Sequence, residues 1–247
     1  MPPFLKTLLA IPCYRESGRL PHFLTELCPV IDALRGVSVL VVDDGSGANE
    51  AAATRASIET LRPHHSCLLP LLELPSNLGK GGAVYEGWSK AGDDCDWLAF
   101  VDADGSCSAS ETARLIQLTR VATLASPAAL FASRVKMLGR SVERQFKRHL
   151  LGRVFATLVS ELLNIPVYDS QCGLKLVPKS AFQSIQPRLT ITGFAFDVDL
   201  LVALMDHGTA VIEVPIDWHE EPGGKVHLLR DSWRMACDVW KIRGTRK

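Results

Sequence analysis

Two aspartates, Asp102 and Asp104, follow the apolar run from Trp97 to Val101 in the motif Asp-Ala-Asp-Gly. Alternate residues of an extended chain face the same side, so both carboxylates could contact one hard cation that water and phosphate oxygens complete. The motif therefore predicts a site for Mg²⁺ or Mn²⁺ at the end of a buried strand. Taken alone, the motif is also compatible with an ordinary Asp-Gly turn.

A second acidic pair, Asp43 and Asp44, comes directly after the apolar run from Val37 to Val42. Carboxylates in such a place can accept hydrogen bonds from a nucleobase N–H or from ribose hydroxyls. Adjacent like charges resist joint burial, because burial without a ligand or cation raises the pKa of one of them. The pair therefore indicates either a nucleoside site or a solvated turn.

The segment 77–82, Asn-Leu-Gly-Lys-Gly-Gly, is rich in glycine and carries one cation, Lys80. Its glycines allow backbone amides to approach a ligand, and Lys80 offers a positive charge to a phosphate or a sugar. The segment is not a Walker loop, because Gly81 rather than Ser or Thr follows Lys80, and its glycine spacing differs from a dinucleotide fingerprint. A glycine-rich helix start is the alternative interpretation.

The hydrophobic pattern predicts a scaffold that brings these segments together. Short β-branched or Leu-rich runs alternate with longer amphipathic stretches, which predicts an α/β fold with a mostly parallel central sheet and helices on both faces. The expected strands are 7–11, 37–42, 68–74, 97–101, 129–133 and 210–214, and the expected helices are 19–34, 50–61, 81–91, 110–124, 142–163, 196–206 and 227–242. Ligands of such sheets bind beyond the carboxyl ends of the strands. The three segments, together with residues 12–16, should therefore line one edge.

Composition narrows the class of protein. The 247 residues carry 27 Lys plus Arg and 27 Asp plus Glu, so no global basic field marks a nucleic-acid binder. Seven scattered cysteines without a Cys-x-x-Cys pair indicate reduced thiols and a cytoplasmic location. No stretch reaches the roughly 20 apolar residues that span a bilayer. We expect a soluble or peripheral membrane protein and, without a repeat or a linker, a single domain over residues 1–247.

The order and spacing of the motifs resemble the family 2 glycosyltransferases, and within them the polyprenyl-phosphate group of dolichyl-phosphate mannose synthases and, more closely, dolichyl-phosphate glucosyltransferases. The resemblance rests on the segments 11–16, 41–46, 77–81, 102–105, 133–134, 169–175, 194–200 and 213–218. It implies a single GT-A domain with a nucleotide-binding half, 1–105, and an acceptor-binding half, 106–247. It also implies inverting, metal-dependent transfer of a hexose from a nucleotide-diphosphate sugar to a polyprenyl phosphate. UDP-glucose is the favoured donor and GDP-mannose the alternative.

The resemblance further implies roles for individual residues. The nucleoside would contact Pro12, Tyr14, Glu16, Asp43 and Asp44, and the diphosphate with its metal ion would contact Lys80, Asp102, Asp104 and Lys225. On the acceptor side, Arg134 would neutralise the acceptor phosphate or the leaving diphosphate. Asp169 would act as a base or orient the acceptor. Asp169, Arg134 and Asp104 are thus the residues expected to act in catalysis.

Two motifs of related enzymes are missing from the sequence. The Gln-x-x-Arg-Trp motif of processive polysaccharide synthases is absent, which argues against polymerisation, and so are the transmembrane segments of many polyprenyl-phosphate enzymes. A glycosyltransferase with a soluble hydroxyl acceptor, which would need Asp169 as its base, is therefore one alternative. A non-catalytic nucleotide-sugar-binding protein is the other.

Two expected helices have features of interfacial helices. A basic cluster between Lys136 and Arg153 surrounds the start of helix 142–163, which carries a broad apolar face. In helix 227–242, Trp233 and Trp240 lie seven residues apart on one face, among basic residues. Such helices can lie on the cytoplasmic face of an anionic membrane. Packing in the core is the alternative interpretation of both.

Overall fold

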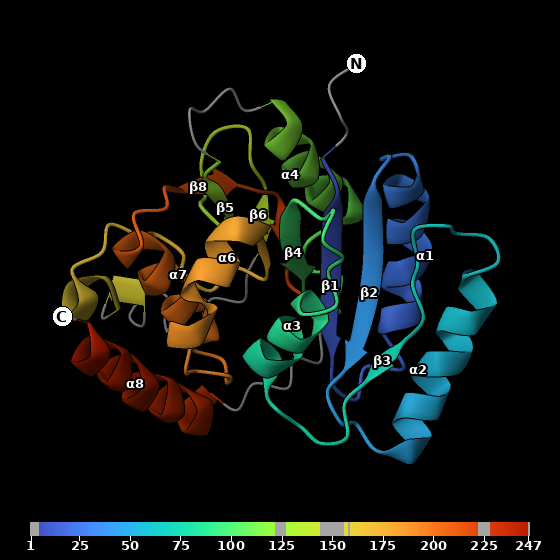
Figure 1. Ribbon diagram of the computed structural model, residues 1–247, viewed down its shortest axis with the longest axis horizontal. Helices are drawn as coiled ribbons and strands as arrows, with labels where there is room; N and C mark the ends of the chain where they lie inside the picture. Colours follow the sequence, from blue (N-terminus) through green and yellow to red (C-terminus); the bar gives the residue numbers. More distant parts are fainter. Residues whose placement is uncertain (1–4, 122–126, 144–155, 158, 222–227, 247) are drawn as a thin grey trace.

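The computed structural model describes residues 5–121, 127–143, 156–157, 159–221 and 228–246, and its centre is a seven-stranded sheet (Figure 1). The strands are β1 (Thr7–Cys13), β2 (Val37–Asp43), β3 (Leu72–Glu73), β4 (Trp97–Val101), β5 (Ala129–Ser133), β7 (Leu174–Pro178) and β8 (Val211–Pro215). Their order across the sheet is β3-β2-β1-β4-β7-β5-β8. Neighbours run parallel except at β7, which is antiparallel to both β4 and β5. The expected mostly parallel sheet is confirmed.

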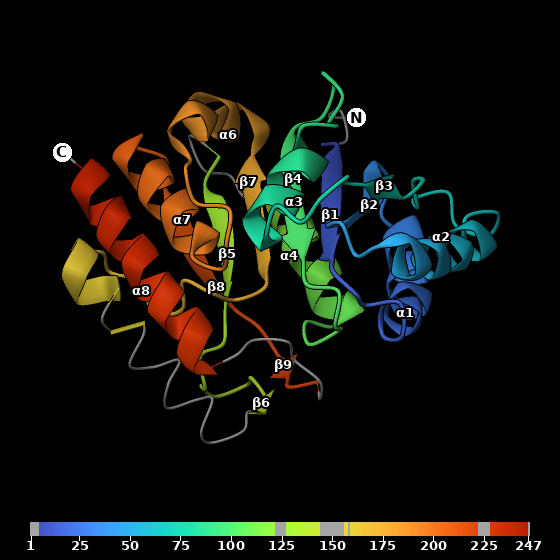
Figure 2. The same cartoon turned by 90° about the horizontal axis from the view of Figure 1, so that it is seen from below.

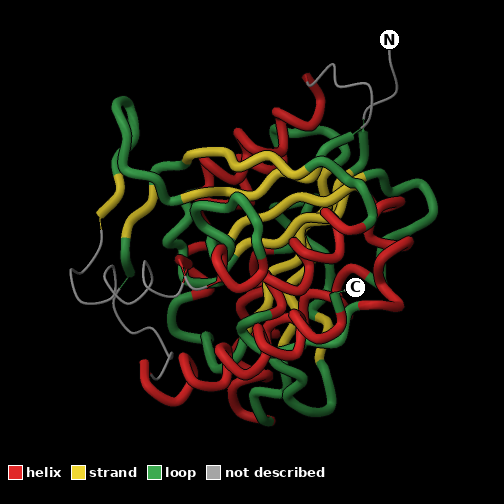
Figure 3. Tube along the Cα trace, turned by 90° about the vertical axis from the view of Figure 1, so that its left-hand side faces the viewer, coloured by secondary structure: helices red, strands yellow, loops and turns green. Residues whose placement is uncertain are grey.

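Helices cover both faces of the sheet, as the tube view shows with strands between two sets of helices (Figure 3). One face is covered by α1 (Leu20–Asp32), α2 (Ala48–Leu61) and α4 (Ala109–Val121), and the other by α3 (Lys80–Trp88), α6 (Lys179–Ile185), α7 (Phe196–Asp206) and α8 (Leu228–Thr245). A short 3-10 helix, Gln186–Arg188, follows α6. On the second face α7 and α8 lie side by side (Figure 2).

The alternation of side chains along each strand divides the core into two clusters. Leu9 and Ile11 of β1 pack in the cluster that contains residues of α1 and α4, whereas Leu8 and Ala10 pack with α3 and α7. All five residues of β4, of β5 and of β7 are buried. Near-continuous apolar runs are typical of central strands that helices cover on both faces. The polar residues at the ends of the strands are therefore the part of the sheet that can contact a ligand.

Several predicted elements have the expected bounds, whereas others, among them β7 and α6, were not expected. The strands 97–101 and 129–133 and the helix 196–206 are confirmed residue for residue. β3 is shorter than expected, although Leu68 still forms an isolated bridge with Val39. β7 and α6 were missed because Lys175 interrupts the apolar run of β7, and lysine is rarely buried in a sheet.

The expected helix 142–163 is wrong at its start. Val142–Glu143 forms the strand β6, which pairs in parallel with β9 (Trp218–His219) as a separate two-stranded sheet. The pairing with β9 satisfies the backbone N–H and C=O groups of these residues, which a helix would have satisfied by hydrogen bonds within itself. Residues 144–155, with much of the basic cluster, lie outside the described residues, and 159–163 are helical. Within the described ranges, no helix combines the length and apolarity needed to cross a membrane.

Candidate active site

The carboxyl end of β4 is the centre of the candidate site. Asp102, the first residue after this strand, donates its backbone N–H to the carbonyl oxygen of Gly173 at 2.9 Å. Its carboxylate lies against the Gly173 backbone, because a β-carbon added at Gly173 would stand 2.0 Å from Asp102 Oδ2. The other carboxylate oxygen, Oδ1, pairs with the Lys80 ammonium at 2.6 Å. Asp102 is thus fixed from two sides.

Asp104 lies two residues further on, and its Oδ1 accepts the backbone N–H of Ser106 at 3.0 Å. Burial raises the pKa of Asp104, and the negative charge of Asp102 raises it further. A cation would relieve this repulsion, so the pair fits a divalent ion. No cluster of three or more His, Cys, Asp or Glu side chains suited to a metal occurs in the described part of the chain. An ion here would depend on these carboxylates together with ligand and water oxygens, as Mg²⁺ commonly does beside phosphates.

Lys80 is the first residue of α3 and follows Gly79, whose φ of +85° favours glycine. Its ammonium lies 5.4 Å from the centre of the Phe100 ring and 5.8 Å from that of Phe196. Burial opposes the charged form, but the negative charges of Asp102 and Asp197 raise the pKa of Lys80 above its ordinary value. A permanent cation at a helix N-terminus provides a suitable place for a phosphate.

The second acidic pair connects the ends of β2 and α3. Asp44 accepts the backbone N–H of Leu78 at 2.7 Å and of Gly79 at 3.0 Å, so it holds the segment that carries Lys80. Burial raises the pKa of Asp44 to about 6, with a smaller contribution from the charge of Asp43. Asp43 Oδ2 accepts the N–H of Ser46 at 3.0 Å, whereas its buried Oδ1 has no hydrogen-bond partner among the residues that the structure describes. Asp43 therefore keeps one acceptor unused below the surface of the site, while both oxygens of Asp44 hold the loop.

The remaining expected nucleoside residues lie at the end of β1, next to β2. Pro12 belongs to β1 itself, and Tyr14 follows it with an exposed ring. Glu16 is engaged in a bidentate ion pair, because its two oxygens accept Nε and Nη2 of Arg19 at 2.8 and 2.7 Å. The sheet thus brings Pro12, Tyr14 and Glu16 to the same edge as the two acidic pairs.

On the other side of β4, a bidentate ion pair follows β5. Arg134 Nε and Nη2 donate to the two carboxylate oxygens of Asp169 at 2.6 and 2.8 Å. The backbone N–H groups of Arg134 and Gln171 donate to the same carboxylate at 3.0 and 3.2 Å. The side chains of Arg134 and Asp169 are 22% and 9% exposed. This geometry favours the orienting role of Asp169 over a role as base, because its lone pairs already accept several donors.

Arg134 connects the two sides of the site. Its guanidinium carbon lies 5.4 Å from the centre of the Trp218 ring of β9. Burial opposes its charge, but Asp169 and, more weakly, Asp102 raise the pKa of Arg134. Asp102 is therefore within electrostatic reach of two cations, Lys80 and Arg134, that come from opposite sides of β4.

The sequence profile of the Glycosyl transferase family 2 matches residues 9–184, from within β1 to within α6. The chain belongs to this family. It is therefore a glycosyltransferase, as its motifs predict.

Relatives within the family are similar over most of their length. A dolichyl-phosphate beta-glucosyltransferase of Saccharomyces cerevisiae is 31% identical over 251 residues, which cover 95% of this chain and 73% of the yeast protein. The protein of the same name from Homo sapiens is 27% identical, with 97% and 78% covered.

Solved structures agree on the fold. The glucosyl-3-phosphoglycerate synthase of Mycobacterium tuberculosis, in complex with Mn²⁺, uridine diphosphate and phosphoglyceric acid, has a TM-score of 0.71 at 14% identity. The similarity covers 97% of this chain and 79% of that one. A complex of the same synthase with Mg²⁺ and uridine diphosphate has a TM-score of 0.68 at 13% identity. At such identity the likeness shows the fold alone, and the GT-A fold is confirmed.

Two charged residues of this family 2 enzyme were not predicted as site residues. Lys175 and Asp197 form a buried ion pair at 2.7 Å, and Asp197 acts electrostatically on Lys80. The sequence signal for this ion pair is a lysine inside the apolar strand Leu174–Pro178. The signal could not be interpreted from the sequence, because the counter-ion of the lysine was not known. Lys225, expected near the diphosphate, lies outside the described residues.

Proposed function

We propose that this glycosyltransferase moves glucose from UDP-glucose to the phosphate of a polyprenyl phosphate, with inversion at the anomeric carbon and with a divalent ion at Asp102 and Asp104. The observation that carries the proposal is the half-buried guanidinium of Arg134, which Asp169 holds in a bidentate ion pair and on which the negative charge of Asp102 also acts. A permanent fork-shaped cation beside the donor carboxylates suits a phosphate acceptor. The names of the relatives, dolichyl-phosphate beta-glucosyltransferases, supply the sugar and the lipid.

On the donor side, the nucleoside would lie against the exposed ring of Tyr14, next to the strand end that carries Asp43. Lys80, at the start of α3, would bind the diphosphate together with the N-terminal amides of that helix. A divalent ion bound by Asp102 and Asp104 supplies neutralisation of the charge that the leaving diphosphate gains. The solved relatives of this fold were crystallised with Mn²⁺ or Mg²⁺ and uridine diphosphate, which supports this class of donor.

On the acceptor side, a phosphate monoester carries about −1.5 to −2 charges at neutral pH because its second pKa is near 6. Its oxygen attacks the anomeric carbon from the face opposite the diphosphate. A carbon–oxygen bond to the acceptor forms, the bond to the diphosphate breaks, and UDP leaves with the electron pair. No proton has to be removed, so the engagement of Asp169 with Arg134 is compatible with catalysis by positioning and charge stabilisation.

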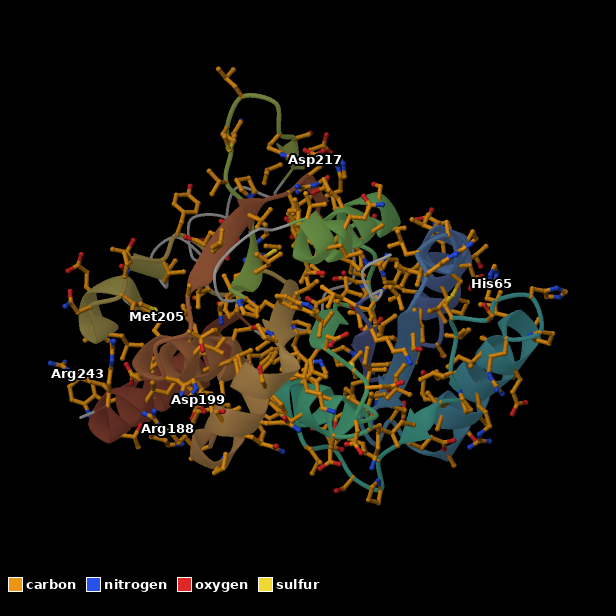
Figure 4. All side chains as sticks on the ribbon, turned by 45° about the horizontal axis from the view of Figure 1, so that its top comes forward. His65, Arg188, Asp199, Met205, Asp217 and Arg243 are labelled. Carbon is orange, nitrogen blue, oxygen red and sulfur yellow. The ribbon has the colours of Figure 1, made fainter. Side chains whose placement is uncertain are left out.

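The outer face of α8 supports an acceptor that is held in a membrane. Trp233 and Trp240 are 73% and 64% exposed, and Arg243 stacks over Trp240 with its guanidinium carbon 5.5 Å from the ring centre. Arg243 lies at the outer edge of the molecule (Figure 4). Met235, on the inner face of α8, contacts Gln171, which lies two residues from Asp169. We propose that α8 rests on an anionic bilayer surface and brings the acceptor side of the site towards it.

Transfer of radiolabelled glucose tests the proposed function. The protein is incubated with UDP-glucose, Mg²⁺ or Mn²⁺ and one of three acceptors: a short-chain polyprenyl phosphate, the corresponding polyprenol, or 3-phosphoglycerate. We expect labelled lipid and released UDP only with the polyprenyl phosphate, and only with metal present. GDP-mannose in place of UDP-glucose tests the donor. Turnover with 3-phosphoglycerate or a soluble alcohol, but with no lipid phosphate, would refute the proposal.

A further inference from the structure

A lysine lies fully buried below the donor site. Lys175 stands in the middle of β7, opposite Phe100 of β4 and Phe131 of β5 in the register of the sheet. Directly opposite residues of neighbouring antiparallel strands share a face, so its ammonium lies 5.4 and 5.0 Å from the centres of these two rings. The side chain of Lys175 is 0% exposed. It therefore lies in the core between the sheet and the helices of the α3 and α7 face.

The Lys175 ammonium has two oxygen partners. It donates to the carbonyl oxygen of Cys172 at 2.6 Å and pairs with Asp197 Oδ1 at 2.7 Å. Asp197 lies in the first turn of α7, where the helix dipole favours a negative charge, and its side chain is only 3% exposed. The Asp197 carboxylate therefore lies against an ammonium that the Cys172 carbonyl group also holds in place.

Stability alone does not account for this pair. Removal of two charges from water costs several kcal/mol per ion, and apolar replacements of buried ion pairs are often neutral or stabilising. A core strand with Leu or Met at position 175 would pack between the same aromatic rings. The pair is therefore expected to have a role in addition to holding the fold.

The contacts of Lys80 indicate that role. Asp197 is one of the two strongest charges acting on Lys80, after Asp102, and Lys80 in turn acts on Asp197. Lys80 also lies over Phe196, the residue before Asp197. The Lys80 ammonium is therefore paired directly with a carboxylate at the site, Asp102, at 2.6 Å, and is attracted through space by a carboxylate in the core, Asp197.

We propose that Lys175 and Asp197 are a positioning pair for Lys80. Lys175 pairs with the Asp197 carboxylate at 2.7 Å, and the negative charge of Asp197, next to the Phe196 ring that Lys80 lies over, attracts the Lys80 ammonium through space and favours the rotamer that points it towards the place of the donor diphosphate. Neither residue touches the substrate. The inference rests on the proposed function in that the ligand of Lys80 is a nucleoside diphosphate.

Binding of UDP or GDP with Mn²⁺, measured by calorimetry on the full chain, tests the pairing without any acceptor. The variants are Asp197→Asn and the double variant Lys175→Met with Asp197→Asn. Lys179→Met is the matched control, because its ammonium donates to the carbonyl oxygen of Gly92 at 2.7 Å, at the opposite end of β7. Thermal unfolding is followed in parallel, so that affinities are compared where every protein is folded.

We expect the double variant to unfold at or above the wild-type temperature, yet to bind the nucleoside diphosphate about 10- to 100-fold more weakly, the scale of a lost partner behind a binding group. Asp197→Asn should weaken binding in the same direction, and the control should not. In a Lys80→Met background, Asp197→Asn should cost no more than about twofold, because residues that act as one unit are not additive.

The outcomes separate the inference from the proposed function. If the wild-type protein binds neither UDP nor GDP, both are overturned. If the wild type binds one of them and folded Asp197→Asn binds it equally well, only the positioning role is overturned. The same holds if Asp197→Asn weakens binding by the same factor with and without Lys80, because the effect would then not pass through Lys80. If the double variant does not fold, Asp197→Asn decides.

Discussion

Replacement of Gly173 by alanine is the sharpest test of the geometry at Asp102. A β-carbon at position 173 would stand 2.0 Å from Asp102 Oδ2 and 2.4 Å from its Cγ, whereas ordinary contact begins at 3.4 Å. Either the carboxylate or the turn must therefore move by about 1.4 Å, and a misplacement of about 1 Å in a site can cost about 100-fold in rate. The carboxylate would leave its pairing distance of 2.6 Å to Lys80.

We expect Gly173→Ala to lower kcat/KM by about 100-fold, which corresponds to about 2.7 kcal/mol of lost transition-state stabilisation. The assay is metal-dependent release of UDP from UDP-glucose with a short-chain polyprenyl phosphate. Gly244→Ala is the matched control, since nothing lies within 4 Å of a β-carbon added there, in the exposed last turn of α8.

The control should keep full activity and gain about 0.5–1 kcal/mol of stability, because alanine is the better helix former. If folded Gly173→Ala stays within about threefold of wild type, Asp102 is not a positioned ligand and the donor site has been placed wrongly.

Three further predictions follow from the contacts of other site residues. Asp104→Asn should weaken metal-dependent binding of UDP by about 10- to 100-fold in calorimetry, with binding in EDTA unchanged. If the variant and the wild type bind UDP equally well in the presence of metal, the metal ion is not bound at Asp104. Arg134→Lys and Asp169→Asn should each lower kcat/KM by about 100-fold, since the two side chains form one bidentate unit. The double variant should lose no more activity than either single variant. Additive losses in kcat/KM would instead show that the two residues have separate roles, such as a base role for Asp169. Burial raises the pKa of Asp44 to about 6, so the native state binds more protons than the unfolded state between about pH 4 and 6. The stability from this group is present below that range and is lost as pH rises through about 6. Urea unfolding at about pH 4.5 and about pH 7.5 should show a larger fall in wild type than in Asp44→Asn, which keeps the contribution of other buried carboxyl groups such as Asp104.

The grouping of the proposed donor-side residues at one edge of the sheet could be predicted from the sequence because its information is local. Asp43, Asp44, Lys80, Asp102 and Asp104 all lie directly after or before elements with strong hydrophobic patterns. Parallel strands place their carboxyl ends at one edge of a sheet, so strand positions and polar ends suffice to group these residues. The individual assignments were less secure: the sequence treats Asp43 and Asp44 alike, while the structure uses both oxygens of Asp44 to hold the loop before α3.

The sequence by itself thus determined the family, the mostly parallel sheet and the edge at which the two acidic pairs lie. Only the tertiary structure decided which charges meet across the sheet. β7 enters antiparallel between β4 and β5, and this insertion places Asp169 against Arg134 and Lys175 against Asp197. A lysine in an apolar strand contradicts its local pattern, because burial of a charge is costly unless a partner is present. That partner, Asp197, belongs to α7, and the sequence around Lys175 does not indicate that α7 packs against this strand.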